Sequence, residues 1–364
     1  MTVFADSKNE FLVVGLMSGT SLDGVDIALC RIKKTNSTKW DYSIEKAVTV
    51  QYSPLWKNKL LDAETVPGLH LIQLHKIYGT YLGELVTDFL KDIKEIPDFI
   101  SSHGHTIFHQ PENQFTFQLG DGAYIAAKTG ITTISDFRNL DVALGGQGAP
   151  LVPIGDRYLF GEFDQCLNLG GFANISFQSS DLRMAFDICP VNIVLNYLSL
   201  KYFQSEYDKD GEFGKKGKVD TPLHERLNKL DYFNELPPKS LGKEWVVKNM
   251  IPVIEDANIS ATDKLRTVYE NISIQLAKTI NSVSGEKVLI TGGGAYNKYL
   301  LELLQKKINK KYEIPDEKVI NYKEALVFAF LGVLRYLNLP NCLCSVTGAA
   351  KDNTGGVIHI QKYL

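Results

Sequence analysis

The stretch that decides the fold lies near the start of the chain and has three parts: Phe11–Leu16 (FLVVGL), Met17–Gly24 (MSGTSLDG) and Val25–Ile32 (VDIALCRI). The first and third parts are rich in apolar and β-branched residues, a composition typical of strands. The middle part is rich in glycine, serine, threonine and aspartate, which favour turns. The stretch therefore predicts a strand, a glycine-rich turn and a second strand.

Similar glycine turns occur twice more along the chain. Cys166–Phe177 (CLNLGGFANISF) predicts two strands with Gly170 and Gly171 in the bend, and Lys287–Ile290 predicts a strand that runs into the glycines 292–294. Backbone amides of such turns can hold a phosphate, because glycine allows close approach. None of the three turns matches the P-loop or the dinucleotide-binding fingerprint, so the sequence gives no support to either fold.

Helical patterns fill much of the remaining chain. Apolar residues recur at helical spacing over 71–93 and 265–283, which predicts two long amphipathic helices. Residues 324–337 are apolar nearly all round, which indicates a helix buried between layers. Residues 208–244 show weak periodicity and predict a long functional loop or lid. Because 364 residues exceed one typical domain, two lobes are expected.

Composition and charge narrow the class of protein. Hydrophobic residues make up 44% and charged residues 22%, as in ordinary globular proteins, and the net charge of -3 offers no positive field for nucleic acid or anionic lipid. Five scattered cysteines fit a reducing compartment, and the lone pair Cys342 and Cys344 predicts no zinc site. Neither a signal peptide nor an apolar run of membrane-spanning length is found. We expect a soluble, cytoplasmic protein without nucleic-acid or membrane partners.

The order of the three glycine turns resembles the layout of the actin, Hsp70 and sugar-kinase superfamily. This resemblance implies an α/β chain with a two-lobed actin-like ATPase (ribonuclease H-like) fold and an interlobe cleft for ATP. We expect residues 1–135 with 338–364 to form the N-terminal lobe, and residues 136–337 to form the C-terminal lobe.

A more specific resemblance is to the anhydro-N-acetylmuramic acid kinases, and it covers nearly the whole chain. The segment GLMSGTSLDGVDIAL (15–29) resembles the opening signature of that family. Further family-like blocks follow in order: SHGHTIFHQP (102–111), QLGDGAYIA (118–126), SDFRNLDVALGGQGAPLVP (135–153), LNLGGFANIS (167–176), DKDGEFGKKGKVD (208–220), PPKSLGKEW (237–245), ITGGGAYN (290–297) and SVTGA (345–349). Many ordered blocks at family-like spacing are much harder to meet by chance than one motif.

The glycine turns supply the expected ATP site. In the first turn, Gly19, Thr20, Ser21 and Gly24 are expected to bind the β- and γ-phosphates, while Asp23 and Asp26 hold Mg²⁺ directly or through water. The alternative is a plain hairpin turn. Gly170, Gly171 and Asn174 resemble the second phosphate loop of the family, and Gly292, Gly293 and Gly294 its adenosine-side loop. The alternative for each of these two loops is an ordinary strand end.

The expected general base is Asp187, in AFDICPVN. An aspartate at a strand end, before a turn and a helix, can present its carboxylate to a ligand. The matching family stretch reads F-D-T-G-P-G-N, and its aspartate is the catalytic base. Ile188, Cys189 and Val191 replace Thr, Gly and Gly of that pattern, which predicts a changed loop geometry. The alternative role of Asp187 is a helix N-cap.

Sugar contacts are expected from two segments and one helix start. His103 and His105 lie in an H-x-H-x₃-H pattern that we interpret as part of a substrate pocket and not as a metal site. Arg138 offers a forked cation for the lactyl carboxylate of a muramic sugar, with Asp136 and Asp141 as partners; an interlobe ion pair is the alternative. Glu324 matches the family pattern E-A-x-x-F-A and is expected to line the cleft, or else to be an ordinary charge at a helix start.

Together these features predict an ATP- and Mg²⁺-dependent phosphotransferase with an alcohol group as acceptor. By resemblance, it converts 1,6-anhydro-N-acetylmuramic acid to N-acetylmuramic acid 6-phosphate with coupled hydrolysis of the anhydro ring, in peptidoglycan recycling. The family resemblance also implies a homodimer. Two alternatives stay open at this point: a kinase of the same superfamily that acts on a different sugar, and a non-catalytic, nucleotide-gated binding protein.

Overall fold

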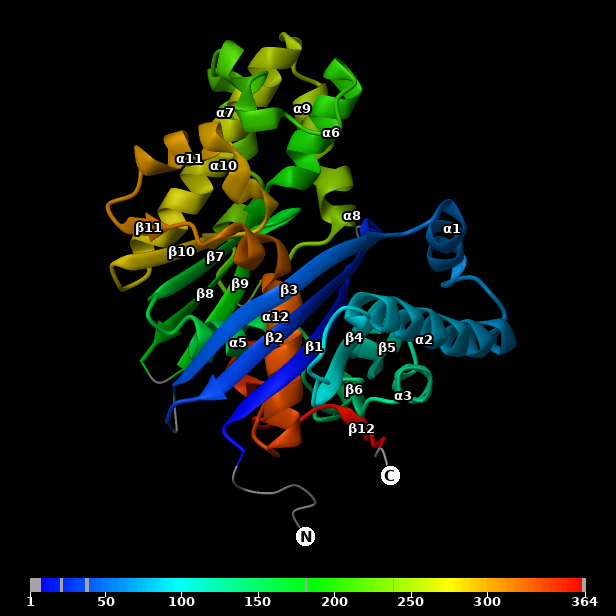
Figure 1. Ribbon diagram of the computed structural model, residues 1–364. Helices are drawn as coiled ribbons and strands as arrows, with labels where there is room; N and C mark the ends of the chain where they lie inside the picture. The colour runs from blue at the N-terminus through cyan, green and yellow to red at the C-terminus, as the bar shows by residue number, and fades with distance from the viewer. Residues whose placement is uncertain (1–7, 20–21, 37–38, 181, 238, 362–364) are drawn as a thin grey trace. The chain divides into compact units, whose positions relative to one another are not determined.

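The chain divides into two compact units, each with its own sheet. A computed structural model describes residues 8–19, 22–36, 39–180, 182–237 and 239–361 (Figure 1). Unit 1 comprises Met1–Gly161 and Tyr322–Leu364, and unit 2 comprises Glu162–Asn321. Within the described residues, no helix combines the length and the apolar character that crossing a bilayer requires.

The sheet of unit 1 has seven strands. They are β1 (Glu10–Ser18), β2 (Gly24–Lys34), β3 (Trp40–Gln51), β4 (Phe99–Gln110), β5 (Phe115–Leu119), β6 (Thr133–Ser135) and β12 (Val357–His359). The order is β12-β6-β4-β1-β2-β3, and β5 pairs with β4. β1, β2 and β3 are antiparallel, whereas β4 and β6 continue the sheet in parallel to β1.

The sheet of unit 2 has five strands. They are β7 (Gln165–Leu169), β8 (Phe172–Ser179), β9 (Leu182–Pro190), β10 (Lys287–Thr291) and β11 (Lys311–Glu313), in the order β11-β10-β7-β8-β9. β7, β8 and β9 are antiparallel, whereas β10 and β11 run parallel to β7. From β9 to β11 the order is β9-β8-β7-β10-β11. This order, with the same strand directions, repeats β3-β2-β1-β4-β6 of unit 1. This repeated mixed sheet confirms the predicted α/β fold of the two-lobed actin-like type.

Helices complete both units. Unit 1 contains α1 (Pro54–Asp62), α2 (Gly68–Leu90), η1 (Pro111–Asn113), α3 (Gly122–Thr129), α4 (Asn139–Ala143), α5 (Val152–Leu159) and α13 (Cys344–Thr347). Unit 2 contains α6 (Asn192–Phe203), η2 (Lys209–Gly211), η3 (Gly214–Lys216), α7 (Thr221–Asn228), η4 (Asp231–Asn234), α8 (Lys243–Trp245), η5 (Val246–Met250), α9 (Ile251–Glu255), α10 (Ala261–Ser282), η6 (Gly293–Tyr296) and α11 (Lys298–Gln305). The two predicted amphipathic helices correspond to α2 and α10, whose apolar faces are buried.

Helix α12 (Glu317–Tyr336) contains the predicted buried helix, and most of it belongs to unit 1. From Ala325 to Leu334 its side chains are almost completely buried. It lies so close to β1 that a Cβ on Gly15 would be 2.0 Å from the Ala325 carbonyl oxygen. Glycine at position 15 therefore allows the strand and the helix to pack backbone to backbone.

The boundaries of the units differ from the predicted lobes, which placed 136–161 and 322–337 in the C-terminal lobe. Both segments pack with each other in unit 1. The Lys323 ammonium on α12 lies 2.7 Å from the Asp156 carboxylate on α5, and a Cβ on Gly155 would meet the Val327 side chain. These contacts join residues far apart in the sequence, so local patterns could not reveal them.

Residues 208–244, predicted as a loop or lid, are instead largely built into unit 2. They form η2, η3, α7, η4 and the start of α8. Their apolar side chains, including Leu223, Leu227, Tyr232 and Phe233, are part of the buried core. The weak periodicity arises because several short helices replace one long amphipathic element.

Candidate functional site

The turn between β1 and β2 carries the first predicted phosphate loop. Gly19 and Gly24 flank it, and Thr20 and Ser21 lie outside the described residues. A Cβ on Gly24 would be 2.4 Å from the Val50 carbonyl oxygen, so only glycine fits beside β3. Leu22 has a positive φ of 60°, which a leucine adopts only where the surrounding turn enforces it.

Acidic groups gather at this turn within unit 1. Asp23 is exposed, and Asp26 lies half-buried on β2, where its Oδ1 accepts a hydrogen bond from the Thr49 hydroxyl at 2.6 Å. Burial raises the pKa of Asp26, the Thr49 hydrogen bond lowers it, and the negative charge of Asp23 raises it further. The two predicted cation ligands are therefore close enough to affect each other electrostatically.

Glu324 belongs to the same acidic group. It is the exposed residue that precedes the buried run of α12. Although its side chain reaches solvent, the protein atoms around it reduce its solvation and thereby raise its pKa. The charge of Asp26 raises the pKa further, and the charge of Arg138 lowers it. Three acidic residues and one arginine therefore share one electrostatic neighbourhood. Within the described ranges, no group of three or more His, Cys, Asp or Glu side chains is arranged as a metal site.

His105 lies behind the turn and supports it. Its Nδ1 is 2.8 Å from the Ser18 hydroxyl, which lies 2.6 Å from the Tyr52 hydroxyl. Tyr52 in turn is hydrogen-bonded to Tyr78. Burial lowers the pKa of His105 to about 4, so the imidazole is neutral at physiological pH. His105 is 4% exposed, and its visible partner is the strand end that leads into the turn.

His103 positions Arg138. The Nε–H of Arg138 donates to His103 Nε2 at 3.0 Å, and the Nδ1–H of His103 donates to its neighbour's carbonyl at Gly104, also at 3.0 Å. These two bonds specify the neutral tautomer with its proton on Nδ1. Burial, and then the charge of Arg138, lowers the pKa of His103. Burial also lowers the pKa of Arg138 to about 10, which still leaves a full positive charge.

Asp141 holds a loop and the C-terminal segment together. Its Oδ2 accepts from the Gly148 amide at 2.8 Å, and its Oδ1 accepts from Thr347 and Asn353. The carboxylate is completely buried. Because these hydrogen bonds are all made within the protein, they indicate that Asp141 stabilises the loop next to Arg138.

A cavity of about 250 Å³ lies within unit 1, near the ends of β5 and β6. It is lined by polar side chains that include His75, His103, Gln118, Asp121, Asp136 and His359. Asp136 has a positive φ of 62°, and the Asn139 amide donates to its carboxylate at 2.5 Å. The cavity therefore brings together two of the predicted sugar contacts, His103 and Asp136. His109, the third histidine of the pattern, is exposed and bonded to Thr116.

The turns of unit 2 lie side by side. Gly170 and Gly171 connect β7 to β8, and both accept backbone hydrogen bonds from the start of α6. Gly292 has a φ of 81°, and a Cβ there would be 2.6 Å from the Asn168 side-chain oxygen and 2.9 Å from the Leu169 backbone. A Cβ on Gly294 would also contact Leu169. The predicted second phosphate loop and the predicted adenosine-side loop therefore meet at the end of β7.

Asp187 lies on β9, opposite Asn174 of β8, which is itself opposite Asn168 of β7. Burial raises the pKa of Asp187, and the hydrogen bond from the Leu241 amide, at 2.9 Å, lowers it. The N-cap of α6 is Val191, with no side-chain cap bond. Asp187 is therefore not the helix N-cap that we considered as an alternative.

The three departures from the family pattern are accommodated in the core. Ile188, Cys189 and Val191 are at most 3% exposed. Val191 adopts φ −125° and ψ −94°, so the turn has no left-handed residue at this position. These backbone angles of Val191 lie outside both the extended and the helical regions, and the expected change of loop geometry relative to the family stays a prediction.

Some residues of these sites were not predicted from the sequence. Asn168 and Thr291 extend the polar row of the unit 2 sheet, since they pair across β7 and β10. Tyr232 and Leu241 contact Asp187 from 45 and 54 residues away. Only the family-like block 237–245 pointed toward this region.

Comparison with known proteins agrees with the geometry. The family model for anhydro-N-acetylmuramic acid kinase matches residues 11–361. The chain is 32% identical to the anhydro-N-acetylmuramic acid kinase of Sulfurovum sp. (strain NBC37-1), over 97% of this chain and 100% of the relative. The corresponding proteins of Sulfurimonas denitrificans and Aliivibrio fischeri are 34% and 35% identical, over 96% and 95% of this chain and 100% and 98% of the relatives.

Among solved structures, the activator of the 2-hydroxyisocaproyl-CoA dehydratase from Clostridium difficile with bound ADPNP is similar with a TM-score of 0.45 and 13% identity, over 90% of this chain and 96% of that chain. The family model and the sequence relatives span essentially the full length of the chain. The chain belongs to the anhydro-N-acetylmuramic acid kinase family.

Proposed function

We propose that this protein is an ATP-dependent sugar kinase that converts 1,6-anhydro-N-acetylmuramic acid to N-acetylmuramic acid 6-phosphate during peptidoglycan recycling. The observation that carries the proposal is Asp187, a half-buried carboxylate on β9 beside the glycine turns of unit 2. Its raised pKa makes it a better proton acceptor than an ordinary aspartate. Membership of the family supplies the substrate class.

The anhydro-sugar has no free 6-hydroxyl, because O6 is bonded to the anomeric carbon. The base must therefore act on water. Asp187 takes a proton from water, the water oxygen bonds to the anomeric carbon, and the bond between that carbon and O6 breaks. O6 then bonds to the γ-phosphorus of ATP, and ADP leaves with the electrons of the broken phosphoanhydride bond.

The turns of both units have the properties that phosphate binding needs. The predicted contacts are Gly19, Thr20, Ser21 and Gly24 for the β- and γ-phosphates, with Gly170, Gly171, Asn174 and Gly292–Gly294 for the remainder of ATP. Gly171 is exposed, and a Cβ there would meet nothing closer than 4.0 Å, so there is room for a ligand beside this residue. Backbone amides stabilise the charge that develops on the transferred group.

Asp23 and Asp26 fit Mg²⁺. Their oxygen atoms are the hard ligands that Mg²⁺ prefers, and one or two carboxylates are enough when phosphate oxygens complete the shell. Burial is the main cause of the raised pKa of Asp26, and the charge of Asp23 adds to it; a bound cation relieves this second, repulsive contribution. The ion would neutralise charge on the phosphates.

Arg138 is the proposed partner of the lactyl carboxylate. His103 binds its Nε, and the Gly148 carbonyl accepts from its Nη1, so the guanidinium is fixed in direction. Asp136 and Glu324 are proposed to bind sugar hydroxyl or amide groups, with His103 at the wall of the 250 Å³ cavity. His105 and Asp141, also predicted as sugar contacts, act in this proposal by holding the turn and the loop next to these groups.

The experiment that tests the proposal is the reaction in ¹⁸O-water. The label is expected at the anomeric oxygen of the product and absent from the phosphoryl group, as read by mass spectrometry of the sugar phosphate. Label in the phosphate would show a phosphohydrolase. Consumption of ATP with an intact anhydro ring would show a kinase of a different sugar.

Two further proposals accompany this function. We place the protein in the cytoplasm, where ATP is supplied, and we infer a homodimer from the family resemblance. Light scattering of the purified protein measures the second directly, and a mass of one chain of 40.7 kDa would contradict it.

A further inference from the structure

Asp187 is bonded by Tyr232 of η4 and by Lys239 and Leu241, which lie between η4 and α8. The Tyr232 hydroxyl donates to the Asp187 carbonyl oxygen at 2.6 Å. The Asp187 amide donates to the Lys239 carbonyl oxygen at 3.2 Å, and the Leu241 amide donates to the Asp187 carboxylate at 2.9 Å. Backbone and side chain of the proposed base are thus fixed by one short stretch of chain.

Lys239 also contacts Tyr232 directly. The Lys239 ammonium donates to the Tyr232 carbonyl oxygen at 2.9 Å and lies 4.4 Å from the centre of the Tyr232 ring. The Tyr232 ring, 3% exposed, packs against Trp245 at 5.5 Å between centroids. Tyr232 and Lys239 therefore join η4 to the residues before α8, and each also makes a hydrogen bond with the Asp187 backbone.

We propose that Tyr232 and Lys239 form a clamp that aims the Leu241 amide at the Asp187 carboxylate and thereby positions the general base. The inference rests on the proposed function, in which Asp187 activates water, and adds two positioning residues to it. Neither side chain bonds the carboxylate itself. Both act through the backbone of β9 and of residues 239–241.

The clamp sets how basic Asp187 is. Burial raises its pKa, and the Leu241 amide is the group that opposes the rise. The other titratable groups around it are Cys189 on β9, Tyr232, Glu235 and Lys239 on the clamp segment, and Lys278 on α10, which acts on Lys239. In variants that keep the packing of the Tyr232 ring, burial of Asp187 persists while the Leu241 bond weakens, so the pKa of Asp187 is expected to rise.

The test uses Tyr232→Phe, which keeps the ring, and Lys239→Met, which keeps most of the aliphatic stem. Lys239→Arg is the conservative rescue. Tyr197→Phe is the matched control, since it removes a hydroxyl that bonds Glu255 elsewhere in unit 2. The direct readout is the titration of the Asp187 carboxyl by carbon-13 NMR of aspartate-labelled protein, with Asp187→Asn to assign the signal.

In Tyr232→Phe and Lys239→Met, the Asp187 titration is expected to move up by about one pH unit, the equivalent of one lost hydrogen bond. The acid limb of the kcat profile should move by the same amount, with kcat reduced more than KM is raised. Lys239→Arg should restore most of the shift, and Tyr197→Phe should show none. An unchanged Asp187 titration in both clamp variants, or an equal change in Tyr197→Phe, overturns the clamp.

Failure of the proposed function gives a different result. If Asp187→Asn keeps full turnover, Asp187 is not the base, yet the NMR titration still reports whether Tyr232 and Lys239 set its pKa. The NMR arm therefore judges the clamp, and the Asp187→Asn arm judges the mechanism.

Discussion

The two sheets share one strand order but organise their acidic groups differently. In unit 1, Asp26 lies on the second strand, bonded to the Thr49 side chain; burial and then the charge of Asp23 raise its pKa, and its own charge raises the pKa of Glu324. In unit 2, Asp187 lies on the third strand and is governed by burial and one backbone amide. The same scaffold thus provides a group of carboxylates in one unit and a single perturbed carboxylate in the other.

The difference teaches how one topology supports two kinds of chemistry. Several carboxylates that repel one another favour a cation, whereas one buried carboxylate favours a proton. The hydrogen bonds that support the two sites differ accordingly. The unit 1 turn is supported by hydrogen bonds between the side chains of His105, Ser18 and Tyr52, whereas Asp187 is held mostly by backbone groups. Each expected outcome below tests this contrast.

The largest effect is expected from the two aspartates. Asp187→Asn should lower kcat by about 10²–10⁴, as expected for a lost general base, while ATP affinity is kept. Asp26→Asn should instead weaken Mg²⁺-dependent ATP binding by about 10- to 100-fold, since one charged ligand is lost. Steady-state kinetics measure the loss of kcat, and calorimetry measures the loss of ATP affinity. If both variants lost kcat and ATP affinity equally, the two aspartates would not differ in role.

Glycines of the unit 2 turns should separate into strained and open positions. Gly292→Ala places a side chain at φ 81° and against Asn168 and Leu169, so unfolding free energy should fall by about 2–5 kcal/mol from left-handed strain and overpacking. At Gly171 a Cβ meets nothing within 4.0 Å, so Gly171→Ala should change stability by less than about 0.5 kcal/mol. Denaturant titration measures both.

A second measurement on Gly171 tests its role. A bulky residue there should raise the KM for ATP, because the amide must approach a phosphate closely. Unchanged ATP affinity in Gly171→Leu, by calorimetry, would remove this turn from the phosphate site.

Acid should weaken unit 1 through His105. Its folded pKa, about 4, lies below the unfolded value of 6.5, so between these values the unfolded chain binds more protons and stability falls as the pH falls. From pH 7 to pH 5 this amounts to about 2 kcal/mol. His105→Gln should remove that part of the pH dependence, leaving the parts that come from His75, His103 and His109, whose pKa values burial also lowers. Hydrogen exchange of the β1 and β4 peptides at the two pH values checks it, and an equally steep loss in His105→Gln would contradict the assignment.

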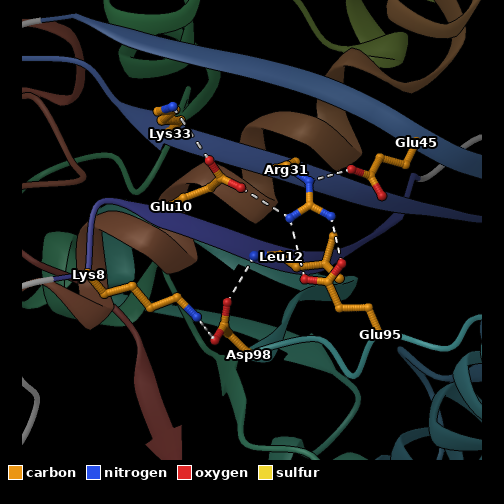
Figure 2. Close-up of polar contacts among 8 residues, drawn as sticks. All are labelled: Lys8, Glu10, Leu12, Arg31, Lys33, Glu45, Glu95 and Asp98. Carbon is orange, nitrogen blue, oxygen red and sulfur yellow. Dashed lines mark hydrogen bonds and ion pairs between the residues drawn. The ribbon is translucent and has the colours of Figure 1, made fainter.

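The smallest effect is expected at the other end of the unit 1 sheet. Figure 2 shows Arg31 bonded to Glu10, Glu45 and Glu95, and Asp98 bonded to Lys8 and to the Leu12 amide. Arg31 pairs with Leu12, five rungs from the Met17–Asp26 pair beside the turn. Because its ion pairs are partly exposed, Arg31→Met should cost about 1 kcal/mol of stability and leave kcat and KM unchanged. A change of kcat or KM would mean that the turn depends on contacts along the full length of β1 and β2.

Local patterns in the sequence predicted much of the fold. The glycine turns at 17–24 and 170–171 and the helices α2 and α10 follow from turn chemistry and periodicity, which act over a few residues. The lobe boundaries were not predictable in this way, because they depend on contacts such as Gly15 with Ala325. Neighbours separated by hundreds of residues leave no local pattern.

The site divides along the same line. Asp187 was predicted from an expected strand end and from the family resemblance; it lies within β9, which continues to Pro190. Tyr232 and Leu241, by contrast, act on it across 45 and 54 residues. Asp141 and His105 have residue types typical of ligand contacts, yet their hydrogen bonds go to the protein itself. Residue type identifies polar groups, but only the three-dimensional neighbourhood decides whether a group faces a ligand or a loop.

The discontinuity of unit 1 has a consequence for synthesis on the ribosome. Residues 1–161 emerge first, all of unit 2 follows, and only then do most of α12 and β12 appear. At a translation rate of roughly 5–20 residues per second, strands β1 to β6 of unit 1 wait on the order of ten seconds for the helix that covers Gly15. During that interval the face of β1 around Gly15 lacks its native cover. Unit 2 is continuous in the sequence. It can therefore complete its own sheet while the face of β1 around Gly15 is still uncovered.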